Sequence, residues 1–162
     1  MIYDHFAAFG RLLLRGKLQF LVAVMSLFCL ESYSQSPSKQ ETVAYINRML
    51  GDKIQVELKG GTLFVTFRDE QQKVVREDKV PTPDLELKIS YEKEGGLLCI
   101  PCFRDQPECV TRTLTAQKIK RGYGRLSIPV TDEKQYEALR KALDHLIRIT
   151  SEEGYKDAIT LD

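Results

Sequence analysis

The sequence predicts an α+β fold, in which an antiparallel sheet of about seven strands stands between an N-terminal and a C-terminal helix. Three observations lead to this prediction. The chain has 162 residues, 43% of them hydrophobic and 29% charged, which suits a single domain. From residue 54 to residue 130, apolar and polar residues alternate in short runs separated by turn residues. On either side of this region, the apolar residues recur at the spacing of an amphipathic helix.

The first helix is predicted from a capping signal. Ser38 and Glu41 have the spacing of a capping box, in which each side chain accepts a hydrogen bond from the backbone amide of the other residue. Gly51 is a suitable residue to end this helix. The expected apolar face comprises Val43, Ile46 and Leu50.

The region between the helices holds the expected strands. Their ranges are 54–59, 63–67, 73–80, 85–91, 97–103, 110–119 and 125–130. Gly60 and Gly61 form a two-residue hairpin signal between the first two strands. Because short turns join most neighbouring strands, a meander is the simplest topology. A sheet of this size must curl, and an amphipathic helix can close its open end, as in a barrel of the pleckstrin-homology (PH)-like type. The alternative is a helix lying on an open antiparallel sheet.

The second helix begins after residue 130. Thr131 is the expected cap, and Asp132 and Glu133 lie in the first turn, where the helix dipole favours acidic residues. The expected buried face comprises Tyr136, Leu139, Leu143, Leu146 and Ile147. We expect residues 151–162 to form a flexible tail, so that the domain proper covers residues 35–150.

Residues 1–34 have the features of an export signal. Basic residues precede an apolar run at 18–30, and Ser32 and Ser34 have the small-x-small spacing of a cleavage site before Gln35. The run is shorter than the roughly 20 residues that span a bilayer, although an uncleaved anchor is the alternative. We therefore expect a periplasmic or secreted protein with no stable membrane span after cleavage. Loss of this segment turns the formal net charge of +1 into zero, which argues against nucleic-acid binding.

Three segments resemble a known group of proteins. They are residues 41–50 (ETVAYINRML), the pair Cys102 and Cys109 around a polar loop, and residues 139–147 (LRKALDHLI). Together they resemble a loose set of short exported bacterial proteins of uncharacterised function. The resemblance implies a PH-like β domain with no known activity. We accordingly expect a non-enzymatic interaction module of the cell envelope that needs no cofactor and binds an envelope protein or a small ligand.

The cysteines allow two interpretations. Six residues separate Cys102 from Cys109, so the two can face each other near a hairpin end and form a disulfide in an oxidising compartment. Cys99 and Cys102 also match a C-x-x-C motif, which makes a thiol-disulfide redox protein the alternative function. Three steps along a strand cover roughly 10 Å, whereas a disulfide tolerates about 7 Å between Cα atoms. The redox pair therefore requires a turn or bulge at Pro101.

One basic cluster is a candidate binding site. It comprises Lys118, Lys120, Arg121, Tyr123 and Arg125. A glycine-rich turn here could hold an anion, with the tyrosine ring available for stacking. The alternative is a solvated hairpin tip whose charges prevent aggregation. The hairpin at Gly60 and Gly61 is the other expected contact region.

The sequence lacks the usual patterns of an active site. It contains neither a G-x-S-x-G motif nor a paired-carboxylate pattern, and His145 is the only histidine after residue 34. The cysteines and this histidine make an unconvincing zinc site. We therefore expect no catalytic residue and no metal site.

Overall fold

The computed structural model describes residues 36–159, with side chains described as far as Glu152. The predicted export signal at 1–34 lies outside these residues. The unit that contains all the described helices and strands begins at Ser38. Within residues 36–159, no helix is long and apolar enough to cross a membrane.

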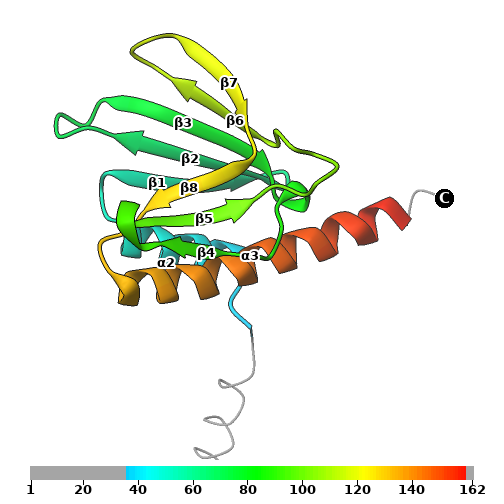
Figure 1. Ribbon diagram of the computed structural model, residues 1–162. Coiled ribbons are helices and arrows are strands. Elements are labelled where there is room, and N and C mark those ends of the chain that lie inside the picture. The colour runs from blue at the N-terminus through cyan, green and yellow to red at the C-terminus, as the bar shows by residue number, and fades with distance from the viewer. Residues whose placement is uncertain (1–35, 160–162) are drawn as a thin grey trace, which may run out of the picture. The chain divides into compact units, whose positions relative to one another are not determined.

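Eight antiparallel strands form two sheets (Figure 1). The five-stranded sheet has the order β1-β2-β3-β6-β7, and the three-stranded sheet has the order β4-β5-β8. The first contains β1 (Ile54–Lys59), β2 (Thr62–Arg68), β3 (Val74–Pro81), β6 (Val110–Leu114) and β7 (Ile119–Tyr123). The second contains β4 (Ser90–Glu92), β5 (Leu97–Pro101) and β8 (Arg125–Pro129). The α+β class is confirmed, and the two sheets do not close into one barrel.

The predicted strand 110–119 is in fact two strands. The chain reverses between β6 and β7, where the Lys118 amide donates a hydrogen bond of 3.3 Å to the Thr115 carbonyl. Lys118 has a φ of 53°, a conformation that usually favours glycine. Because this turn contains neither glycine nor proline, the sequence pattern does not reveal it.

The predicted strand 85–91 is mostly irregular. A short 3₁₀ helix, η2 (Thr82–Asp84), follows β3, and Leu85 makes an isolated bridge to Cys102. Only Ser90–Glu92 belongs to a strand. Leu85 is buried but Leu87 is 40% exposed, so the alternation of this segment does not mark one buried face of a continuous strand.

The meander prediction is wrong as a description of the whole sheet. The chain changes sheet between β3 and β4, between β5 and β6, and between β7 and β8. The last change takes place at Gly124 alone, which separates the two strands. A second 3₁₀ helix, η3 (Lys93–Gly95), connects β4 to β5.

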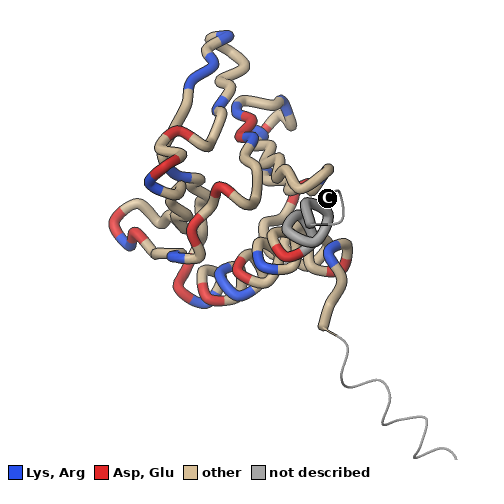
Figure 2. Tube along the Cα trace, turned by 90° about the vertical axis from the view of Figure 1, so that its right-hand side faces the viewer, with Lys and Arg blue, Asp and Glu red and all other residues tan. Residues whose placement is uncertain are grey.

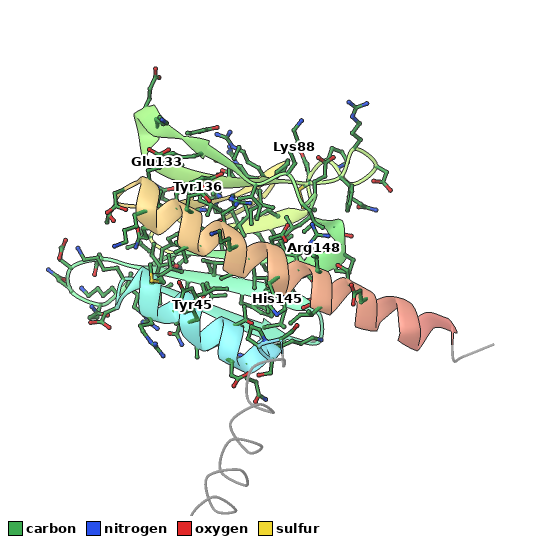
Figure 3. All side chains as sticks on the ribbon, turned by 90° about the horizontal axis from the view of Figure 1, so that it is seen from below. Tyr45, Lys88, Glu133, Tyr136, His145 and Arg148 are labelled. Carbon is green, nitrogen blue, oxygen red and sulfur yellow. A yellow bond between two sulfur atoms is a disulfide. The ribbon has the colours of Figure 1, made fainter. Side chains whose placement is uncertain are left out.

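The two α-helices lie side by side below the sheets (Figure 3). In α2 (Lys39–Leu50), the predicted capping box is present: Glu41 accepts from the Ser38 amide at 2.8 Å, and Ser38 accepts from the Glu41 amide at 3.3 Å. Ile46 is fully buried, whereas Val43 and Leu50 are half-buried.

The second helix, α3 (Glu133–Ile159), is longer than predicted. Its cap is Asp132 rather than Thr131, because the Asp132 carboxylate accepts from the Gln135 amide at 2.7 Å. The backbone stays helical past residue 150, where a flexible tail was expected. The predicted buried face is confirmed, since all five of its residues belong to the core.

Candidate functional site

The predicted basic cluster is divided between two elements. Lys118 lies in the turn before β7, and Lys120 and Arg121 are exposed residues of β7 itself. Tyr123 ends β7 and is half-buried. Arg125 lies in β8, in the other sheet, where it forms an ion pair with Glu92. The structure therefore brings four of the five predicted residues together and removes the fifth.

β7 is an edge strand of the five-stranded sheet and lies away from both α-helices (Figure 1). The direction of its backbone groups follows from the neighbouring strands. In an antiparallel sheet, successive residues direct their N–H and C=O groups to opposite sides. The amide of Thr115, just after β6, donates to the carbonyl of Val75 in β3 at 3.1 Å. The odd-numbered residues of β6 therefore direct their backbone N–H and C=O groups toward β3, and the even-numbered residues direct theirs toward β7.

This alternation leaves an open backbone edge on β7. Arg121 is paired with the even-numbered Arg112, so its N–H and C=O point back toward β6. The N–H and C=O groups of Lys120 and Gly122 must then point outward. No hydrogen bond joins these outward groups to another described residue.

Three cations accompany this open edge. Lys118, Lys120 and Arg121 form no ion pair with any described residue, and basic residues mark the hairpin at the top of Figure 2. Adjacent residues of a strand point to opposite faces, so Lys120 and Arg121 place positive charge on both faces of the sheet. The edge therefore combines unused hydrogen-bonding groups with uncompensated charge.

The opposite edge of the same sheet, β1, is occupied at its centre by a side chain of α2. Asn47 Nδ2 donates to the Val56 carbonyl at 2.9 Å, and the Val56 amide donates to Asn47 Oδ1 at 2.7 Å. The backbone N–H and C=O of Val56 point away from the sheet at the centre of β1, because those of its neighbours Gln55 and Glu57 bond to β2. The amide of Asn47 thus occupies the position of a neighbouring strand.

The two edges of the three-stranded sheet also receive side chains from other elements. At β8, Arg76 Nη2 donates to the Ser127 carbonyl at 2.8 Å. Next to β4, the Tyr136 hydroxyl of α3 donates to the Ile89 carbonyl at 3.3 Å. Each of these contacts meets the backbone of a single residue. At β7, the Cys102 sulfur lies 3.5 Å from the Tyr123 carbonyl oxygen at the end of the strand, and no described side chain bonds to the outward groups of Lys120 or Gly122.

A buried ion network supports β7 from the inner side of the sheet. Asp78 accepts from Arg112 Nε at 2.8 Å and from Arg76 Nε at 2.9 Å, and its side chain is fully buried. The Arg112 guanidinium lies 4.3 Å from the centroid of the Tyr123 ring at the end of β7. This contact holds the end of the open edge strand against β6.

The predicted pair Cys102 and Cys109 lies at disulfide distance, with sulfurs 2.06 Å and Cα atoms 5.8 Å apart. The loop between them packs against the end of β7. A Cβ atom on Gly122 would lie 2.6 Å from Glu108 Oε2, and one on Gly124 would lie 2.9 Å from the Pro107 carbonyl oxygen. These glycines allow the close approach of the loop.

The redox interpretation finds little support in the geometry of Cys99. Its thiol is buried, lies 3.9 Å from Ser127 Oγ and belongs to the regular ladder of β5. Burial raises the pKa of the Cys99 thiol, which opposes formation of the nucleophilic thiolate. The sulfur of Cys102 is at bonding distance from Cys109 instead.

A groove of about 810 Å³ adjoins the predicted hairpin at Gly60 and Gly61. It runs between one side of α2, including Val43, and the segment that contains Leu58 and Pro83. Among the described residues, no buried side-chain polar atom lacks a hydrogen-bond partner, so no orphaned buried group in this groove points to a ligand. The groove is therefore a less specific feature than the β7 edge.

The described residues contain no group of three or more potential metal ligands. His145 lies on α3 and is half-buried (Figure 3). No protein-family model matches the chain, and no curated protein or solved structure is significantly similar to it.

Proposed function

We propose that the protein is an exported, non-enzymatic interaction module of the bacterial cell envelope, which binds a partner protein along the open edge of β7. The observation that carries this proposal is the contrast among the four sheet edges. A side chain from another element bonds to one backbone residue in β1, in β8 and next to β4, whereas the middle of β7 keeps outward backbone groups and is accompanied by three uncompensated cations. Strand addition at an exposed edge is a common mode of peptide recognition.

Two features support the proposed periplasmic or secreted location. Residues 1–34 have the order of a signal sequence, with a basic stretch, an apolar run and small residues. Cys102 and Cys109 lie at disulfide distance, and disulfides persist in oxidising compartments. Kinship with PH-like modules is part of the same proposal, and is supported by the antiparallel sheets and by the apolar side of α3 that enters the core.

A photo-crosslinking experiment tests the proposed binding edge. Thr66 and Thr113 lie in the same row of paired residues across the sheet, Thr66 next to β1 and Thr113 next to β7. Both threonines are half-buried. A photoreactive amino acid at either position therefore samples one of the two edges without removing a cation.

We expect a discrete crosslinked adduct from position 113 and none from position 66 when the full chain is expressed in its native host. Mass spectrometry of the adduct identifies the partner and the crosslinked segment. Equal capture from both positions, or capture from neither, contradicts the proposal.

A further inference from the structure

We infer that the β7 edge binds an extended acidic segment of a partner protein as a sixth, antiparallel strand of the sheet, with the pattern apolar-any-acidic-acidic-apolar from its N-terminus. This inference rests on the proposed function and names the chemistry of the partner. The outward N–H and C=O groups of Lys120 and Gly122 supply the hydrogen bonds of the new ladder. Such main-chain bonds provide affinity, and the side chains provide selectivity.

The two acidic positions follow from Lys120 and Arg121. These residues are adjacent, so their side chains lie on opposite faces of the sheet. An added strand also alternates its side chains between the faces, and two consecutive acidic residues can therefore meet both cations at once. Opposite charges at facing positions of neighbouring strands stabilise the pair.

The flanking positions follow from the neighbours of Arg121 on its own face. Ile119 and Tyr123 are half-buried and lie on either side of Arg121 along β7. On the added strand, apolar residues two positions before and two positions after the acidic residue that meets Arg121 would cover Ile119 and Tyr123. The remaining position faces Gly122, where the carboxylate of Glu108 lies close by, so a third acidic residue is unfavourable there.

Charge also argues against a second copy of this chain as the occupant. Pairing of β7 with another β7 would bring Lys120 and Arg121 of one molecule next to those of the other. Like charges at facing positions destabilise neighbouring strands. The same cations that oppose self-association favour an acidic partner.

The first test measures binding of labelled synthetic peptides to the full exported chain by fluorescence anisotropy. The probe contains two adjacent glutamates between valines in the stated pattern, and its matched control has lysines in place of the glutamates. We expect the acidic peptide to bind at least about tenfold more tightly. With the double variant Lys120→Glu and Arg121→Glu, the preference should reverse. Equal binding of both peptides, or no binding of either, overturns the inference.

The second test isolates the backbone. Lys120→Pro removes an outward N–H and leaves the ladder between β6 and β7 intact, whereas Lys120→Ala removes only the cation. We expect the acidic peptide to bind the proline variant roughly fivefold more weakly than the alanine variant. Equal affinities of the two variants contradict strand addition.

The outcomes separate this inference from the proposed function. A partner crosslinked at position 113 together with a failure of the acidic peptide to bind leaves the binding edge in place and overturns its acidic specificity. Concentration-dependent dimers in light scattering, abolished by Lys120→Pro, identify a second copy as the occupant and overturn both the acidic partner and the argument from like charge.

Discussion

Asp78 is a fully buried carboxylate between two arginines, Arg76 and Arg112, which are themselves mostly buried. Its removal would leave two guanidinium groups beside each other without a counter-charge. We expect Asp78→Ala to lower the free energy of unfolding by about 3–5 kcal/mol, measured by urea denaturation. The exposed neighbour Glu77 supplies the control, since Glu77→Ala should change stability by no more than about 0.5 kcal/mol. Similar midpoints for the two variants would contradict this role of the network.

Cys99 provides a prediction of pH dependence. Its pKa is raised by burial, so the folded state keeps the thiol protonated at a pH where the unfolded state ionises it. This contribution to stability is complete at a pH below the pKa of the thiol in the unfolded state. It is lost as the pH rises toward the pKa of the thiol in the folded state. Replacement by alanine should therefore reduce the loss of stability at alkaline pH, as followed by thermal melting across a pH series.

Accessibility of the same thiol can be measured directly. We expect the described region of the folded, oxidised chain to resist alkylation at neutral pH. After denaturation, this region should incorporate one label, at Cys99. Peptide mapping without reductant should recover Cys102 linked to Cys109. Rapid labelling of the native protein, or a link between Cys99 and Cys102, would favour the redox function instead.

The junction of β7 with β8 is tightly packed at two glycines. A Cβ atom on Gly124 would lie 2.9 Å from the Pro107 carbonyl oxygen, and one on Gly122 would lie 2.8 Å from the Cβ atom of Glu108. Neither neighbour can move away by a side-chain rotation, so Gly122→Ala and Gly124→Ala should each destabilise the protein by about 1–3 kcal/mol. Thermal melting checks both variants, and an unchanged melting temperature of either one would exclude a rigid contact at that glycine.

The elements that could be predicted from the sequence are those determined by neighbouring residues. The capping box at Ser38 and the hairpin at Gly60 and Gly61 depend on local geometry, and both are present. The turn after Thr115 was missed because Lys118 adopts a positive φ without the usual glycine signal. Alternation at 85–91 was misleading because it also occurs in an irregular segment, in which Leu85 is buried and Leu87 is exposed.

The candidate site shows the same limit. Lys120 and Arg121 were recognised as a basic cluster, but their position on an open edge depends on the order of strands, which has no local signal. Arg125 has the same chemistry and only three residues separate it in sequence from Arg121, yet a change of sheet places it next to Glu92. The contact of Asn47 with Val56 joins residues of two elements, and a lone asparagine in a helix gives no indication of it.

For the whole molecule, stability depends on one core shared by both sheets and both α-helices. Leu143 of α3 is fully buried within this cluster. A carboxylate there would be desolvated without a partner, and we expect Leu143→Asp to lower the free energy of unfolding by at least about 4 kcal/mol. Lys141→Asp, at an exposed position of the same helix, is the control. Chemical denaturation measures both variants. Equal free energies of unfolding for Leu143→Asp and Lys141→Asp would contradict the shared core.

The occupied centre of the β1 edge has a consequence for assembly. Growth of a β-fibril requires each molecule to accept a neighbour on one edge and to offer another edge to the next. Asn47 already satisfies both outward groups of Val56, so a new strand can pair along β1 only after this contact breaks, whereas β7 needs no such step. The two sides of the five-stranded sheet therefore differ in how readily they accept a strand. This difference hinders continuous growth through the sheet while the β7 edge stays exposed.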